Sequence, residues 1–157
     1  MRRVYVASPL GFAEPTKQYY GETLLPALAA VIQPVDPWSL MDPARVAELR
    51  ASHGDSALAR EIGRLNIEAI RGCAGLVAVL DGQEADSGTV AELGYAAGLG
   101  VACFGLRSDM RTMGEPGTSI TLQVEAFIEY SGGSLHSSLS ELVEALRLWG
   151  QDRTSAA

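Results

Sequence analysis

Residues 76–98 read LVAVLDGQEADSGTVAELGYAAG. The first five residues form an unbroken apolar run, which is typical of a central parallel strand that is covered on both faces. Residues 81–85 form a polar loop, and a helix of small and apolar residues is predicted to follow, with Glu92 inside it. The stretch therefore predicts a strand, a loop and a helix in succession, which is the repeating unit of an α/β fold.

Strand and helix patterns alternate over the rest of the chain as well. Further strands are predicted at 4–7, 31–35, 101–105 and 126–130, and further helices at about 15–30, 44–51, 57–70 and 139–149. This alternation indicates a single doubly wound, Rossmann-like or flavodoxin-like α/β domain with a five-stranded, mainly parallel sheet in the order 2-1-3-4-5. We expect the domain to cover residues 1–150 and residues 151–157 to form a flexible tail.

Two details of the second strand region add to this picture. Pro34 has no N–H group to donate, so it favours an edge position for the strand at 31–35. The segment 36–54 then carries Pro37, Trp38 and Pro43. It is predicted to be an excursion from the alternating pattern, or a lid over a site.

The charge of the chain excludes several classes of partner. The 157 residues include 19 acidic and 12 basic side chains, a net charge of −7. That balance lacks the positive surface that binding to a phosphate backbone or an anionic membrane requires. No apolar run approaches the roughly 20 residues of a membrane span, and Pro9 and Glu14 interrupt any signal-peptide core. We expect a cytoplasmic protein with neither nucleic acid nor membrane as a partner.

The sequence offers no pattern for a metal or a redox centre. Cys73 and Cys103 stand thirty residues apart in apolar settings, without the paired spacing of zinc or disulfide-exchange motifs. Buried free thiols are the simpler interpretation. Neither a metal ion nor a cofactor is therefore predicted.

Glu92 is the side chain that most needs an explanation. Charged residues are rarely buried among small apolar neighbours unless they are paired or used chemically. Asp86 stands at the mouth of the same helix, where its simplest role is that of an N-cap. In the predicted strand order the carboxyl ends of strands one and three are neighbours, so residues 8–12 face residues 81–89 across one crevice. Two acids in such a crevice can serve as proton donor and nucleophile.

Five segments together resemble one known family. They are YVASPLGF at 5–12, NIEAI at 66–70, VAVLDG at 77–82, DSGTVAELGYA at 86–96 and LQVE at 122–125. In order and spacing they resemble the nucleoside 2-deoxyribosyltransferase family, from the first strand to about Gly133. The resemblance implies a cofactor-free enzyme of nucleotide salvage that transfers a 2-deoxyribosyl group between purine or pyrimidine bases. Its partners would be a 2'-deoxynucleoside, a free nucleobase and further copies of the chain, in a dimer or larger homo-oligomer with shared active sites.

The resemblance also implies roles for individual residues. Glu92 would attack the anomeric carbon and form a covalent glycosyl ester, with net retention after transfer. Asp86 would hold the base and protonate it, and Tyr5 would hydrogen-bond Glu92. The residues implied to bind the substrate are Ser8, Pro9, Gly11, Phe12, Asp81, Gly82, Gly88, Thr121 and Gln123. Phe12 would lie along the base, and Ser8 and Gly11 would let the first loop bend close to the sugar.

Two positions depart from the family pattern. Ala74 replaces an Asp that would contact the base, and Thr121 replaces an Asn that a neighbouring subunit contributes to the sugar 5'-hydroxyl. Two alternatives therefore stand beside the transferase. One is a nucleoside 5'-monophosphate N-glycosidase that uses the same Glu92 with water, and the other is a nucleoside-binding protein with weakened catalysis.

Other conspicuous residues have simpler interpretations. Arg107, Asp109 and Arg111 either position a ligand or subunit or form a solvated charged turn. Trp38 and Trp149 are predicted to be structural.

Overall fold

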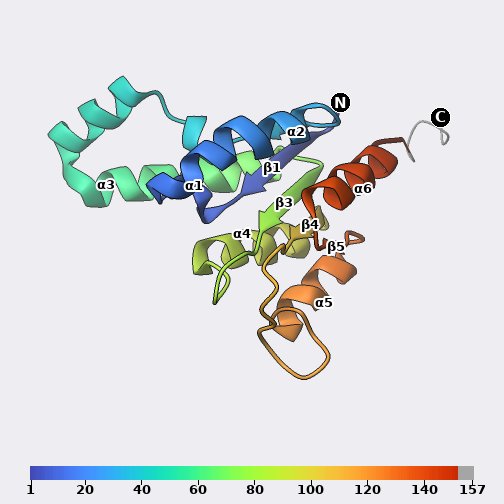
Figure 1. Ribbon diagram of the computed structural model, residues 1–157. Coiled ribbons are helices and arrows are strands. Elements are labelled where there is room, and N and C mark those ends of the chain that lie inside the picture. The colour runs from blue at the N-terminus through green and yellow to red at the C-terminus, as the bar shows by residue number, and fades with distance from the viewer. Residues whose placement is uncertain (152–157) are drawn as a thin grey trace.

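Five parallel strands form the central sheet of the structure, a computed structural model that describes residues 1–151 (Figure 1). The sheet order is β2-β1-β3-β4-β5, which confirms the predicted order 2-1-3-4-5. The strands are β1 (Arg3–Ala7), β2 (Gln33–Val35), β3 (Gly75–Val79), β4 (Ala102–Leu106) and β5 (Leu135–His136). β2 lies at an edge, as its proline predicts.

Helices cover both faces of the sheet. One face packs against the π-helical turn η2 (Tyr20–Leu24), α2 (Leu25–Ala29) and α6 (Leu139–Gln151), and α1 (Glu14–Tyr19) leads into η2 without a buried residue of its own. The other packs against α3 (Pro43–Arg71), α4 (Ser87–Gly98) and α5 (Leu122–Tyr130). Alternate strand residues supply the two cores: Val4 and Val77 face α2 and α6, whereas Tyr5 and Leu76 face α4. This is the predicted doubly wound arrangement.

The fifth strand was predicted at the wrong place. Residues 126–130 belong to α5, and β5 is the two-residue strand Leu135–His136, which pairs with the end of β4. Within α5, Val124 and Ile128 are both buried, at the i,i+4 spacing of a helix face. Short apolar runs fit a strand and a buried helix equally well, so local pattern alone could not separate them.

The segment after β2 wraps over one end of the sheet. A short 3-10 helix, η3 (Pro37–Ser39), leads into α3, and the two helices predicted at 44–51 and 57–70 are the two segments of α3. They meet at Gly54, whose φ of 77° and ψ of 174° interrupt the helix in a conformation that glycine adopts without strain. Figure 1 shows the first segment of α3 (teal) reaching away from the sheet.

Three further expectations concern the chain as a whole. Both cysteines are free and buried. Among the described residues, no helix combines the length and the apolar character that crossing a membrane would require. Of the tail predicted at 151–157, Gln151 ends α6, and residues 152–157 lie outside the described residues.

Candidate active site

A cavity of about 420 Å³ opens at the carboxyl ends of β1 and β3. One wall is polar and comes from the ends of these strands, from α4 and from one side chain of α3. The opposite wall is apolar and comes from the loop after β1, from η3 and from α3. The lining residues are Ser8, Phe12, Pro37, Trp38, Met41, Val46, Ile62, Asn66, Asp86, Gly88, Thr89 and Glu92. The cavity lies in the crevice that parallel α/β sheets use for ligands.

Glu92 lies in the polar wall with one carboxylate oxygen held by two donors. The hydroxyl of Tyr5 donates to Oε1 at 2.7 Å, and Nδ2 of Asn66 donates to the same oxygen at 3.2 Å. Tyr5 is fully buried on β1, and Asn66 lies on the second segment of α3. A strand and two helices therefore converge on this carboxylate, which fixes its position at the cavity wall.

The surroundings of Glu92 change its acidity. Burial raises the pKa of the carboxyl group above its ordinary value, and the nearby carboxylate of Asp86 raises it further, whereas the hydrogen bonds from Tyr5 and Asn66 lower it. Burial and the Glu92 charge also raise the pKa of Tyr5, so its hydroxyl stays protonated and remains a donor. A carboxylate in this setting is poised to act as a nucleophile or base while ionised.

Asp86 combines a structural and a chemical position. It is the N-cap of α4, because its Oδ2 accepts from the backbone N–H of Thr89 at 2.8 Å and from the Thr89 hydroxyl at 3.1 Å. The same side chain lines the cavity. The capping role expected for Asp86 is therefore present, and it leaves the carboxylate at the cavity wall.

Two aromatic rings form a corner of the apolar wall. Phe12 is 72% exposed and meets Trp38 edge to face, with ring centroids 4.7 Å apart. Gly11 makes this packing feasible, since a Cβ there would lie 2.3 Å from the Trp38 ring. Asp36 anchors the segment: it accepts from the Tyr20 hydroxyl at 2.7 Å and from the Trp38 backbone N–H at 3.0 Å.

Comparison with known families identifies the family of this chain. The family model described as "Nucleoside 2-deoxyribosyltransferase" matches residues 4–138, which is most of the chain. The chain belongs to the nucleoside 2-deoxyribosyltransferase family. It is therefore an enzyme of the nucleoside deoxyribosyltransferase kind, or a closely related N-glycosidase. A comparison of the sequence with curated proteins gave no significant match.

Solved structures share the fold of this deoxyribosyltransferase-family chain at low sequence identity. A 2-deoxyribosyltransferase from Leishmania mexicana matches with a TM-score of 0.64 and 20% identity, over 97% of this chain and 99% of that one. One from Bacillus psychrosaccharolyticus matches with a TM-score of 0.66 and 16% identity, over 90% of each chain. A CMP N-glycosidase from Clostridium botulinum matches with a TM-score of 0.58 and 17% identity, over 94% and 99%. At these identities the matches show the fold alone.

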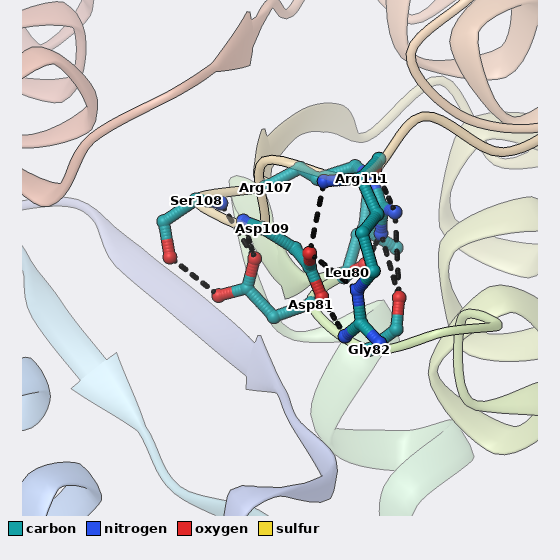
Figure 2. Close-up of polar contacts among 7 residues, drawn as sticks. All are labelled: Leu80, Asp81, Gly82, Arg107, Ser108, Asp109 and Arg111. Carbon is teal, nitrogen blue, oxygen red and sulfur yellow. Dashed lines mark hydrogen bonds and ion pairs between the residues drawn. The ribbon is translucent and has the colours of Figure 1, made fainter.

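Several residues implied to bind substrate lie elsewhere in this family member. Asp81 does not line the cavity, because its carboxylate accepts from the Ser108 hydroxyl at 2.9 Å and from the backbone N–H groups of Ser108 and Asp109. Gly82 offers its carbonyl to Arg107, at 3.3 Å and 3.4 Å. Figure 2 shows how these contacts tie the loop after β3 to the loop after β4.

Arg107 is the centre of this connection. It is only 5% exposed, and its guanidinium donates to the carbonyls of Leu80, Gly82 and Arg111 (Figure 2). Arg107 was predicted either to position a ligand or subunit or to lie in a solvated charged turn. Neither description fits, because Arg107 is buried and its guanidinium binds backbone carbonyls. Arg111, in contrast, is exposed and paired with Asp109. The loop that Arg107 holds leads directly to Asp86.

We expect Arg107→Met to destabilise the fold by about 2–4 kcal/mol, because three carbonyls lose a charged donor and at least one stays buried. Urea unfolding followed by circular dichroism measures this change. The matched variant is Arg111→Met, which removes an exposed side chain and should change the unfolding free energy far less than Arg107→Met does. Equal stability of the two variants would contradict the structural role of Arg107.

Thr121 and Gln123 lie in a second hollow, away from Glu92. Both are exposed, and the hollow measures about 410 Å³ between α4 and the start of α5. It is lined by Glu84, Ala85, Ser87, Val90, Met113, Thr121, Gln123, Val124 and Phe127. The structure therefore does not bring Thr121 and Gln123 together with Glu92 within one chain.

Two other positions near the strands also lie outside the cavity lining. Pro9 opens the 3-10 helix η1 (Pro9–Gly11), which Ser8 caps, and it shapes the loop without lining the cavity. Ala74 lies just before β3, at the amino end of that strand, whereas Asp86 follows its carboxyl end. The N–H group of Ala74 donates to the Arg3 carbonyl. A five-residue strand spans about 17 Å. Ala74 therefore does not line this cavity, and the consequence of the missing carboxylate at position 74 stays a prediction.

Sequence reasoning missed two residues of the site. Trp38 was predicted to be structural, but it lines the cavity, and Asn66 was given no role although it contacts Glu92. The available signal for Asn66 was a polar side chain one helical turn after Ile62, on a stripe that is otherwise apolar. Trp149 is structural as predicted: it packs edge to face on Phe104 and lies under the Arg2 guanidinium.

Proposed function

We propose that this protein transfers a 2-deoxyribosyl group from one nucleobase to another through a covalent ester on Glu92. The observation that carries the proposal is the Glu92 carboxylate at the cavity wall, with one oxygen held by Tyr5 and Asn66. Family membership supplies the class of reaction. In this proposal Glu92 is the nucleophile, Asp86 is the nearby acid and the apolar wall of the cavity receives the base.

The chemistry takes two displacement steps. In the first, a Glu92 oxygen forms a bond to the anomeric carbon while the N-glycosidic bond breaks, and the bonding electrons leave with the base. In the second, the nitrogen of another base forms a bond to the same carbon and the ester bond breaks. Two inversions give net retention, by the logic of retaining glycosidases. The raised pKa of Glu92 means a more basic carboxylate, which favours its attack on the anomeric carbon in the first step.

Asp86 is proposed to move the proton that this exchange needs. A departing purine or pyrimidine anion is a poor leaving group, and protonation of a ring nitrogen or exocyclic oxygen lowers the barrier. Asp86 lines the same cavity and is held by its contacts with Thr89, so it presents a fixed carboxyl group to the base. The proton returns to Asp86 when the incoming base attacks.

The apolar wall is proposed to hold the base. Phe12 and Trp38 form an aromatic corner, and Met41, Val46 and Ile62 continue the same wall. Flat heterocycles pack well on aromatic and aliphatic surfaces, and these residues shield the reacting bond from water. Ser8 and Gly88 lie in the lining and are proposed to contact the sugar or base.

Thr121 and Gln123 keep a proposed role only in an oligomer. They are exposed and border the second hollow, so they do not reach the cavity of their own chain. We propose that copies of the chain associate through this region and that Thr121 contributes to the site of a partner copy.

The cavity favours a nucleoside over a 5'-monophosphate. Its lining contains two carboxylates, Asp86 and Glu92, and no lysine or arginine among the described residues. A phosphate dianion next to two carboxylates is repelled. We therefore expect kcat/KM for 2'-deoxyadenosine to exceed that for its 5'-monophosphate by roughly 10-fold or more. A preference for the monophosphate, with release of deoxyribose 5-phosphate, would support the N-glycosidase instead.

The direct test is base exchange. The protein is incubated with 2'-deoxyinosine with and without adenine, and the products are separated chromatographically. We expect 2'-deoxyadenosine to form only when adenine is present, with little free deoxyribose. Release of deoxyribose at the same rate in both samples would identify a hydrolase.

A further inference from the structure

In the side chain of Asn66, one polar atom has a hydrogen-bond partner among the described residues and the other, although buried, has none. Its Nδ2 donates to Glu92 Oε1 at 3.2 Å. Its Oδ1 is buried and has no hydrogen-bond partner among residues 1–151. The reverse orientation of the amide would place two acceptor oxygens against each other, so the contact with Glu92 determines how the side chain lies.

Stability alone does not account for an asparagine at this position. A buried acceptor without a partner disfavours the folded state, whereas an apolar side chain here would continue the stripe that includes Ile62 on the same helix. Asn66 comes from α3, which the kink at Gly54 brings back over the cavity, and Glu92 comes from α4. The hydrogen bond therefore couples the covering segment to the reactive carboxylate.

The two donors that reach Glu92 both bind the same oxygen. Tyr5 and Asn66 donate to Oε1, and Oε2 accepts no hydrogen bond among the described residues. Hydrogen bonds withdraw electron density from the oxygen that accepts them, so the oxygen without them is the stronger nucleophile. One side of the carboxylate is thus anchored, and the other is available for bond formation.

We infer that Asn66 is a positioning residue for the nucleophile: together with Tyr5 it holds Oε1 of Glu92 and leaves Oε2 as the oxygen that bonds to the sugar carbon. This inference rests on the proposed transfer reaction and adds a residue and an atom to it. As Oε2 forms its bond to the anomeric carbon, the electrons of the N-glycosidic bond leave with the base, which takes a proton from Asp86.

A neutral amide suits this role because the surroundings of Glu92 already carry negative charge. The titratable groups that act on Glu92 are Tyr5 from β1, Tyr20 from η2 and Asp86 at the start of α4. None of these is a cation. An amide supplies a donor without adding a charge, whereas an aspartate at position 66 would add a second like charge beside the nucleophile.

Two substitutions test the inference through the acidity of Glu92. We expect Asn66→Leu, which removes the donor, to raise the pKa of Glu92, and Asn66→Asp, which adds a like charge, to raise it by about one unit or more. Carbon NMR titration of the labelled Glu92 carboxyl group measures this directly, with the signal assigned by its loss in Glu92→Gln. Because Asn66→Asp preserves the shape of the side chain, the titration can be carried out on this variant if Asn66→Leu does not fold. Arg64→Ala is the control, since this exposed residue lies on the same helix outside the cavity.

Base exchange provides the second readout. We expect kcat to fall roughly 10-fold in both Asn66 variants while KM stays within about threefold, and the acid limb of the pH profile to move to higher pH. An unmoved titration, or a change in KM alone, would overturn the inference. Absence of exchange in the parent protein together with a shifted titration would instead reject the proposed transfer reaction and with it the assignment of Oε2.

Discussion

Glu92→Gln should abolish base exchange, with a loss of kcat on the order of 10⁴-fold or more. Glutamine keeps the length of the side chain and an oxygen that can accept from Tyr5 and Asn66, so the fold and the cavity should survive. The neutral amide is not a nucleophile for the sugar carbon, and it cannot stabilise the positive charge that develops on the sugar in the transition state. Chromatographic assay of 2'-deoxyadenosine formation measures the loss.

A trapped intermediate makes this result specific. Incubation of the parent protein with a 2'-deoxynucleoside in the absence of acceptor should add one deoxyribosyl group to the peptide that contains Glu92, detectable by mass spectrometry. Glu129→Gln, which removes an exposed carboxylate on α5, should keep both the activity and the adduct. Exchange at the parental rate in Glu92→Gln would remove Glu92 as the nucleophile. Ligand binding without any adduct in the parent would favour the nucleoside-binding protein.

Asp86→Asn should lower kcat by roughly 10²- to 10³-fold, because the leaving base loses its proton donor. Asparagine is as good an N-cap as aspartate, so the contacts with Thr89 and the stability of α4 should be preserved. The loss should depend on the leaving group. A 7-methylated purine deoxynucleoside, whose base departs as a neutral molecule, should lose far less activity than 2'-deoxyadenosine.

The capping role of Asp86 is separated from its chemical role by a second variant. Asp86→Ala should lose the cap as well and destabilise the protein by about 1 kcal/mol relative to Asp86→Asn, measured by urea unfolding. If Asp86→Asn exchanged bases at the parental rate with every substrate, Asp86 would be an N-cap and nothing more.

Strand β3, the candidate residue Glu92 and the position of the crevice could be predicted from the sequence. The first two depend on neighbouring residues, and the third depends on the rule that parallel α/β sheets bind ligands where the strand order reverses. An apolar run of five residues predicts β3, and a carboxylate within an apolar helix marks Glu92 as a candidate. The strand order then brings the loop after β1 next to the loop after β3. The family resemblance implied a hydrogen bond between Tyr5 and Glu92, and the structure contains it.

The apolar wall of the cavity could not be predicted from the sequence in the same way. Met41 precedes α3, Val46 lies before the kink at Gly54, and Ile62 and Asn66 lie after it, so the cavity wall combines both segments of α3. A helix with an apolar stripe has the same local pattern whether the stripe packs on a core or on a ligand site. Trp38 illustrates this ambiguity, since a tryptophan beside two prolines is as readily structural as functional.

The loop residues show a different limit of sequence reasoning. Asp81 and Gly82 follow β3 directly, so the resemblance placed them near the substrate. In the folded protein their polar groups bond to Ser108, Asp109 and Arg107 from the next loop. A carboxylate or carbonyl at a strand end can serve a ligand or a neighbouring loop, and only the partner that lies within reach decides between them.

By itself the sequence determined the α/β class, the strand order and the shared crevice of Asp86 and Glu92, because apolar periodicity and crossover handedness are properties of nearby residues and of chain topology. Only the tertiary structure decided which oxygen of Glu92 is held, which wall encloses the cavity and where the fifth strand lies. Those features depend on contacts between residues far apart in the chain, such as the 26 positions that separate Asn66 from Glu92. Packing and hydrogen-bond geometry, rather than local preference, choose such partners.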